Sequence, residues 1–409
     1  MRRILVAVAV LVCSCTKNPV EVAPPKPPAP APQTLDQLIE RELPHLVGEE
    51  LVDLGTRRVK IEAAGPVEVK PDAEKKFIEL KLPIGTQLQV QCFLYPTPID
   101  AGATIARAIA QVKSRFAVAS IRLVAVEVVE RAPALFVELN YLVDAPTGKQ
   151  GGQLKLAVFP DTGSPVFCLH DEPGYQKSFQ RITTRLASIL ARSAPETGPV
   201  TTYQTVSIDT LNGVPVGFDT VRFSKTADGV QHIATVSTLL LPRSATEWMA
   251  QDSATISDLD ADSIISARRV IAATNGELQL NMLATHHGGR LYTYAGTSSG
   301  KALSGSFKTK GARGFESDVL LGRALKNELL TDKVKQLEVE QYLPDLTPLA
   351  PTVFVVRRLS SGPRVVELST PQLKMIATVD ANGDSEATEL QLGTFVLHST
   401  RKFIEGKPE

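Results

Sequence analysis

Ser298 is the residue of this sequence that most resembles a catalytic nucleophile. It lies in Gly296-Thr-Ser-Ser-Gly300, which has the Gly-x-Ser-x-Gly pattern of a nucleophile elbow, a sharp turn between a strand and a helix that exposes the serine hydroxyl. Residues 291–295 have the composition of a strand, but the glycines that follow Ser298 disfavour the required helix. His398 is the one histidine downstream that could act as a base. The pattern therefore favours a Gly/Ser-rich hairpin loop.

Two histidines and three aspartates have spacings that suggest metal ligands. His286 and His287 are adjacent, and adjacent residues of a strand point to opposite faces, so both cannot easily bind one ion. Asp258, Asp260 and Asp262 resemble the opening of a calcium loop. That loop needs glycine at its sixth position and glutamate at its twelfth, where this chain has serine and arginine. We interpret the two histidines as the tip of a polar hairpin, and the aspartates do not complete a calcium loop.

His170-Asp-Glu172 is a third polar cluster, and Pro173-Gly174 follows it directly. Proline and glycine at this place indicate a turn between a strand and a helix. Taken together, these patterns predict no catalytic residue, no metal site and no cofactor.

The chain has four cysteines, and two of them lie in the interior of the sequence. Cys92 and Cys168 belong to strand-like runs at 88–95 and 165–170. In an oxidising compartment they could form a disulfide. Two reduced, buried cysteines that act as small apolar residues are the alternative, and the sequence does not decide between them.

The first residues have the order of a secretory signal. Arg2 and Arg3 are followed by an unbroken apolar run from Ile4 to Val12, and then by Cys13-Ser14-Cys15. Nine apolar residues make about 14 Å of helix, whereas a bilayer core is about 30 Å thick. We expect a signal peptide at 1–14 that is removed and not a permanent membrane span.

Ser14-Cys15 resembles the lipobox of bacterial lipoproteins, in which a small residue precedes the cysteine that becomes acylated. Val12 and Cys13 depart from the commonest form of that motif. The resemblance implies a lipid anchor on Cys15, with palmitate among its acyl groups, and a location in the cell envelope. Because Thr16 and not aspartate follows the cysteine, the resemblance favours the outer membrane over the inner one.

A proline-rich stretch follows the proposed anchor. Residues 19–33 contain seven prolines, which fix φ and favour an extended polyproline conformation. We therefore predict that 15–33 is a linker that holds the folded part away from the membrane.

Charge and length restrict the remaining possibilities. Without residues 1–14 the chain has 42 basic and 44 acidic residues, so it lacks the basic surface that a nucleic acid would need. The hydrophobic content of 43% is sufficient for packed cores. The length after the linker predicts two domains, at 34–195 and 200–409, with a Pro/Gly-containing joint between them.

The first domain has the pattern of an antiparallel α/β sandwich. We predict helices at 34–43, after Asp100 as N-cap, and at about 175–192. Strands are expected near 56–63, 66–70, 75–82, 87–95, 117–130, 134–143, 153–160 and 164–170. This order resembles the PsbP-like fold, with the nearest local similarity at 168–179. That family consists mostly of adaptors and assembly factors, so the resemblance implies a non-enzymatic role.

The second domain is dominated by hairpin signals. Asn212-Gly213, Asp228-Gly229, Asn275-Gly276 and Asn382-Gly383 each lie between β-rich stretches. We expect short helices at 244–249 and 318–330, and strands near 352–358, 363–369 and 373–380. The pattern resembles the open β-barrel of the LolA/LolB lipoprotein carriers, notably at 211–217 and 378–383, and β domains that accompany transglutaminase-like modules.

The overall prediction is an α+β chain: an antiparallel α/β sandwich, then a β-rich, open-barrel-like domain with short helices. The function expected is that of a non-enzymatic envelope lipoprotein that binds a hydrophobic ligand or an envelope protein. One alternative is an extracytoplasmic hydrolase or transferase that uses a dispersed acidic site or Ser298. Another is a structural assembly factor.

Overall fold

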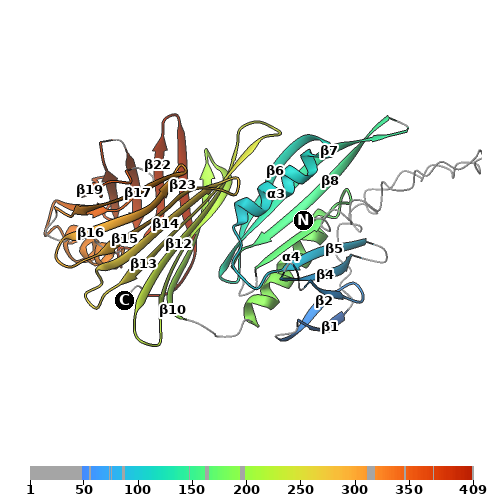
Figure 1. Cartoon of the computed structure of the whole chain (residues 1–409), viewed down its shortest axis with the longest axis horizontal. Coiled ribbons are helices and arrows are strands. Elements are labelled where there is room, and N and C mark those ends of the chain that lie inside the picture. The colour runs from blue at the N-terminus through green and yellow to red at the C-terminus, as the bar shows by residue number, and fades with distance from the viewer. Residues whose placement is uncertain are drawn as a thin grey trace, which may run out of the picture. The chain divides into compact units, whose positions relative to one another are not determined.

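The computed structural model describes residues 48–407, except 55–56, 73, 75, 85–87, 147, 162–164, 194–198, 311–317, 345–346 and 372. Residues 41–409 form one compact unit, which contains a two-stranded, a seven-stranded and a fourteen-stranded sheet (Figure 1). The predicted signal peptide, Cys15, the linker and the helix at 34–43 lie outside the described residues.

The seven-stranded sheet is antiparallel and has the order β3-β4-β5-β9-β8-β7-β6. A separate hairpin, β1 and β2, precedes it. The bounds of these strands are β1 Gly48–Asp53, β2 Arg58–Ala63, β3 Glu68–Asp72, β4 Phe77–Ile84, β5 Leu88–Leu94, β6 Ala117–Val129, β7 Ala132–Ala145, β8 Gly148–Phe159 and β9 Val166–His170.

Two helices cover the two faces of this sheet. Helix α3 (Ala101–Lys113) packs on one face with Ile105 and Ile109, and helix α4 (Gln176–Arg192) packs on the other with Phe179 and Leu186. Both helices have apolar residues at a spacing of three to four, which places those side chains on one side of each helix. Figure 1 shows α3 lying over β6, β7 and β8.

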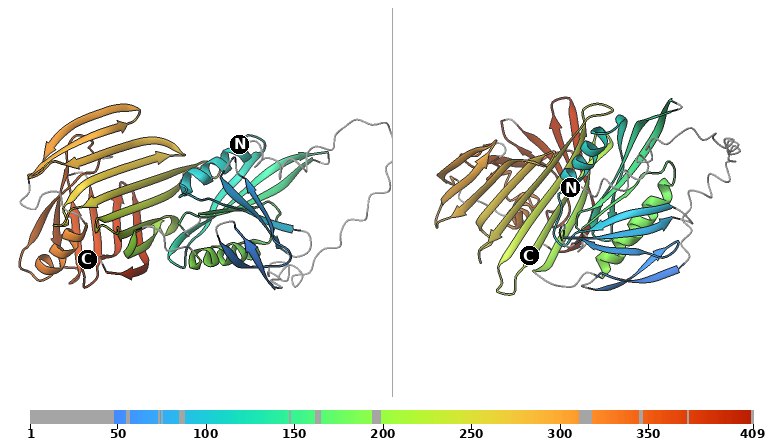
Figure 2. Two further views of the ribbon diagram at one scale, coloured as in Figure 1. Left: turned by 60° about the horizontal axis from the view of Figure 1, so that its bottom comes forward. Right: turned by 45° about the vertical axis from the view of Figure 1, so that its right-hand side comes forward.

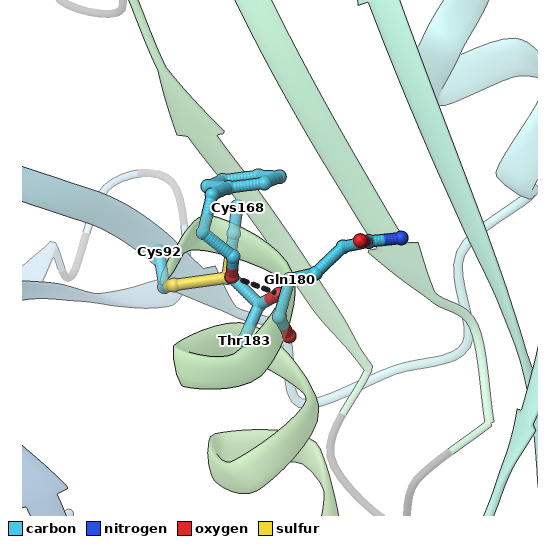
Figure 3. The surroundings of a disulfide bond; sticks show 5 residues. Cys92, Cys168, Gln180 and Thr183 are labelled. Atoms are coloured by element: carbon cyan, nitrogen blue, oxygen red, sulfur yellow. Dashed lines mark hydrogen bonds between the residues drawn. A yellow bond between two sulfur atoms is a disulfide. The ribbon is translucent and has the colours of Figure 1, made fainter. Parts of the chain in front are cut away.

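Cys92 and Cys168 are direct partners in the ladder between β5 and β9, and a disulfide joins them. Both are fully buried in the apolar cluster beneath α4. In Figure 3 the bond lies beside Thr183, whose hydroxyl donates a hydrogen bond of 2.8 Å to the carbonyl of Phe179. The disulfide therefore links the sheet at the point where the helix covers it.

The fourteen-stranded sheet is antiparallel throughout and has the order β17-β16-β15-β14-β13-β12-β11-β10-β23-β22-β21-β20-β19-β18. Its strands are β10 Val200–Leu211, β11 Val214–Lys225, β12 Gln231–Pro242, β13 Trp248–Leu259, β14 Ile265–Thr274, β15 Glu277–His286, β16 Leu291–Ser298, β17 Lys301–Lys308, β18 Gln336–Gln341, β19 Thr352–Arg358, β20 Val365–Ser369, β21 Lys374–Val379, β22 Ser385–Leu392 and β23 Phe395–Gly406. Figure 2 shows the sheet from two further sides.

Asn-Gly turns set the register of several hairpins in this sheet. Asn212-Gly213 and Asn275-Gly276 have positive φ at both residues, at 51° and 83° and at 52° and 82°. A type I′ turn needs positive φ at both central positions, and its twist matches that of the flanking strands. The predicted turns at Gly229 and Gly383 also have positive φ, at 91° and 90°.

The prediction of a short helix at 244–249 is wrong. Residues 243–247 form a tight connection in which Arg243 N–H and Ser244 N–H both donate to the carbonyl of Glu247, and β13 begins at Trp248. The polar residues at its start resemble a helix N-cap, but the ladder with β12 outweighs that local preference. The predicted helix at 318–330 is present as α5 (Asp318–Ala324) and the π-helical turn η1 (Leu325–Leu329).

Side chains hold the two edges of the large sheet together. Strands β17 and β18 are not paired with each other in the described part of the chain. The carboxylate of Glu340, next to the end of β18, accepts the backbone N–H of Lys310 at 2.9 and 2.7 Å. The rings of Tyr342 and Phe307 stack with centroids 5.3 Å apart. The sheet is therefore curled but open, and an aromatic cluster fills its inner side near these edges.

A second apolar cluster on the inner side packs α5 and η1 against β18 to β21.

The chain shares three features with the predicted fold class: mainly β structure, antiparallel sheets and a few helices.

Candidate functional site

Ser298 and His398 are in different parts of the large sheet. Ser298 ends β16 and pairs with Lys301 across a hairpin turn, so strand β17 follows where a nucleophile elbow needs a helix. His398 lies on β23, and six strands separate β16 from β23 in the sheet order. His398 lies beside Glu389 of β22, with 3.8 Å between Nδ1 and Oε2. The described residues therefore provide no serine–histidine pair at this motif.

The other polar motifs take part in local structure. His286 stacks on Tyr292, while His287 Nε2 lies 2.7 Å from the hydroxyl of Thr293. Asp260 Oδ1 accepts the N–H groups of Asp262 and Ile264, so this aspartate stabilises a turn. Among the described residues, no three His, Cys, Asp or Glu side chains are grouped so that they could hold a metal ion.

His170 is buried at the end of β9. Its Nδ1 lies 3.1 Å from the carbonyl oxygen of Gln89, and its ring stacks against Phe179 and meets Tyr175 edge-on. These contacts fix the junction between β9 and α4. Glu172 is exposed and contributes its backbone carbonyl as acceptor for the Lys155 ammonium group.

A groove between α3 and strands β12 and β13 is the best candidate for a binding site. Its volume is about 260 Å³. The wall from the large sheet consists of Leu240, Trp248, Ala250 and Asn275, and the wall from α3 consists of Ile105, Ala106, Arg107, Ile109, Ala110 and Lys113. Ligand pockets commonly have ~300 Å³ or more, so the groove suits one narrow chain better than a bulky molecule.

The floor of the groove is apolar and its rim is polar. Ile105, Leu240 and Ala250 are buried and belong to one apolar cluster, on which Trp248 packs. Arg107, Lys113 and Asn275 are exposed. The buried indole Nε1–H of Trp248 has no acceptor among the described residues. An apolar surface with a few polar groups at its edge is typical of a ligand site.

Asp252 on β13 holds α3 in place beside the groove. Its Oδ1 and Oδ2 accept the backbone N–H groups of Gly102 and Ala103 at 2.9 and 2.8 Å, and its Oδ1 also accepts the hydroxyl of Thr238 at 2.8 Å. A Cβ atom at position 102 would lie 2.8 Å from the Asp252 carboxylate, so glycine allows this approach. Burial raises the pKa of Asp252, although these three donors oppose the effect.

The N-cap position of α3 agrees with the prediction, but the side chain at that position does not cap the helix. Asp100 occupies the N-cap position of α3 but makes no side-chain capping hydrogen bond. The first N–H groups of a helix have no partner within the helix, and here an acid from a strand about 150 residues later in the chain satisfies two of them. Local sequence contains no signal for such a cap.

Replacing Asp252 with alanine should lower the free energy of unfolding by about 2 kcal/mol, because two buried N–H groups lose a charged acceptor. Asp100→Ala is the matched control and should change it by less than about 0.5 kcal/mol, as expected for an exposed side chain. Urea unfolding of both variants, followed by circular dichroism, measures the difference. Equal effects of the two substitutions would contradict the assignment of the cap.

Two acidic side chains lie together on the inner side of the large sheet. Asp209 on β10 is buried, and burial and the neighbouring Asp219 raise its pKa to about 8. Burial raises the pKa of Asp219 as well. Ser399 pairs with Asp209 and Ser237 pairs with Asp219 in the strand ladders. Two carboxyl groups in such surroundings share a proton more readily than both ionise.

Comparisons with known proteins identify no family for this chain. No protein family model matches it, and no curated protein matches it. One solved structure that is similar is described as a β-barrel-like protein of the domain of unknown function DUF1849 from Brucella abortus. The two share 12% identity with a TM-score of 0.37, over 51% of this chain and 99% of the other.

None of the helices in the described residues combines the length and the apolar character that crossing a bilayer requires.

The sequence patterns predicted neither the groove nor the acid pair. Trp248 is the one tryptophan of the chain but belongs to no motif, and Asp209 lies in an ordinary strand pattern, so neither gives a recognisable signal.

Proposed function

We propose that this chain is a non-enzymatic cell-envelope lipoprotein that binds the apolar chain of a ligand in the groove between α3 and strands β12 and β13. The observation that carries the proposal is the apolar floor of that groove, made by Ile105, Leu240 and Ala250 and bordered by Trp248. Burying each methylene of a ligand there would contribute about 0.8 kcal/mol.

The position of the chain in the envelope is part of the proposal. The signal-like residues 1–14 and the lipobox-like Cys15 support it, as does a disulfide, which oxidising compartments permit and the cytoplasm rarely does. Intact-mass analysis of protein from its natural cells should show a chain that begins at an acylated Cys15. An unmodified Cys15 or a retained leader would contradict the anchor.

Trp248 makes the binding proposal directly testable. It is the one tryptophan of the chain, so a change in its fluorescence reports on the groove alone. Titration with decanol should shift its emission and saturate. Ala110→Phe would place a ring in the groove, since Ala110 is an exposed lining residue, and should abolish the shift. Gln111→Phe, on the same helix but outside the groove, is the control and should bind normally.

Partner-protein binding is a second candidate, favoured by one observation. Val236, Ile256 and Leu283 are 38%, 41% and 38% exposed. They lie on β12, β13 and β15, with Arg269 of β14 between the last two. Clustered apolar side chains at a surface indicate association. Envelope cross-linking would test it, because Ile256→Asp should remove a specific adduct while leaving decanol binding intact. A cross-linking pattern unchanged by Ile256→Asp would count against this surface.

A further inference from the structure

The groove has an uneven distribution of charge. Its apolar floor is bordered on the α3 side by Arg107 and Lys113, both exposed, and helix α3 contains no acidic residue. Arg107 donates through Nε to the carbonyl of Ala103 at 3.2 Å and through Nη2 to the hydroxyl of Thr104 at 3.4 Å. These acceptors are neutral. No ion pair of Arg107 or Lys113 is found within the described part of the chain.

The stability of helix α3 accounts for only one of these two cations. A lysine in the last turn interacts favourably with the helix dipole, which accounts for Lys113 by itself. Arg107 lies in the middle of α3, where the dipole has little effect. The groove thus combines an apolar floor with two positively charged side chains at its rim.

We infer that the ligand of this groove is a single-chain amphiphile with an anionic headgroup. This inference rests on the proposed function, since it assigns the headgroup of the ligand whose apolar chain the groove would take. The chain would lie on Ile105, Leu240 and Ala250, and the carboxylate or phosphate would lie between Arg107 and Lys113. Hydrogen bonds between charged groups are stronger than neutral ones, so the headgroup selects among amphiphiles with the same tail.

The test compares headgroups on one tail. Trp248 fluorescence of the purified chain is titrated with decanoate, decyl phosphate, decanol and decyltrimethylammonium, each kept below its micelle-forming concentration. We expect the two anions to bind about tenfold more tightly than decanol and the cation to bind least. The ratio of decanoate to decyl phosphate tells whether the source is a fatty acid or a phosphorylated lipid.

Variants connect the preference to the two cations. Arg107→Gln and Lys113→Gln should each reduce the affinity for the anions about three- to tenfold and leave decanol binding unchanged. The double variant Arg107→Glu, Lys113→Glu should prefer decyltrimethylammonium. Arg115→Gln is the control, because Arg115 is exposed just after α3 and does not line the groove.

The outcomes separate this inference from the proposed function. If all four probes bind equally, the groove takes apolar chains but the anionic ligand is refuted. If no probe changes the emission of Trp248, both the proposed function and the inference fail. Circular dichroism of each variant is recorded first, because an unfolded variant would lose binding for a trivial reason. The charge-reversed variant is decisive for the anionic ligand, because it must gain affinity for the cation.

Discussion

Reduction of the Cys92–Cys168 disulfide should lower the free energy of unfolding by about 4 kcal/mol. The bond closes a loop with a sequence separation of 76 residues, and a cross-link of that length removes about this much conformational entropy from the unfolded chain. Urea unfolding with and without a thiol reductant measures the change as a shift in midpoint.

The location of the bond makes its reduction slow in the folded protein. Both cysteines are fully buried between the sheet and α4, so a reductant reaches them only when that region opens. Cys92→Ala with Cys168→Ala should show the same loss without reductant and no further loss with it. Identical midpoints for the parent chain in both conditions would mean that the two cysteines are not bonded in solution.

The free energy of unfolding should fall as the pH rises between about 4 and 8, because of the Asp209 carboxyl. This group alone should remove on the order of 4 kcal/mol at pH 7. Its folded-state pKa is about 8 and its ordinary value is 3.8. The folded chain therefore keeps a proton that the unfolded chain has lost. Below the ordinary pKa both states are protonated and no stability is lost. As the pH rises toward 8, about 1.4 kcal/mol is lost per unit.

Asp209→Asn isolates this contribution, because asparagine has nearly the same shape and does not titrate. At pH 8 the variant should be more stable than the parent, and at pH 4 the two should be similar. Other acids act in the opposite direction: the ion pair with Lys374 and Arg357 lowers the pKa of Glu367. The difference between parent and variant cancels such effects. Asp262→Asn, at an exposed turn, is the control. Parallel pH curves for the parent and Asp209→Asn would refute the shared proton.

Local patterns predicted the elements of this fold well. The Asn-Gly pairs gave the hairpin turns because positive φ at two successive residues is a strict local requirement. The apolar spacing of α4, from Phe179 to Leu190, predicted its buried face for a similarly local reason. The mistaken helix at 244–249 shows the limit, since there the pairing of β12 with β13 decides the conformation.

The candidate site depends on contacts that no local pattern contains. Asp252 meets Gly102 across 150 residues, and the groove exists only because α3 packs against strands from a later part of the chain. The same holds for Asp209, whose raised pKa comes from its burial and from Asp219 on the next strand. A local sequence pattern shows which residues are acidic or apolar, but it does not show which distant residues they contact in the fold.

The contacts that Glu340 and Tyr342 make between the two edges of the large sheet, here called the clasp, also affect association between separate molecules. Each outermost strand of a sheet has backbone groups on one side that can recruit a strand from another molecule. Here β17 and β18 are drawn toward each other, and lysines stand at both ends of β17. The clasp and these lysines therefore disfavour the addition of a strand from another molecule at this end of the sheet.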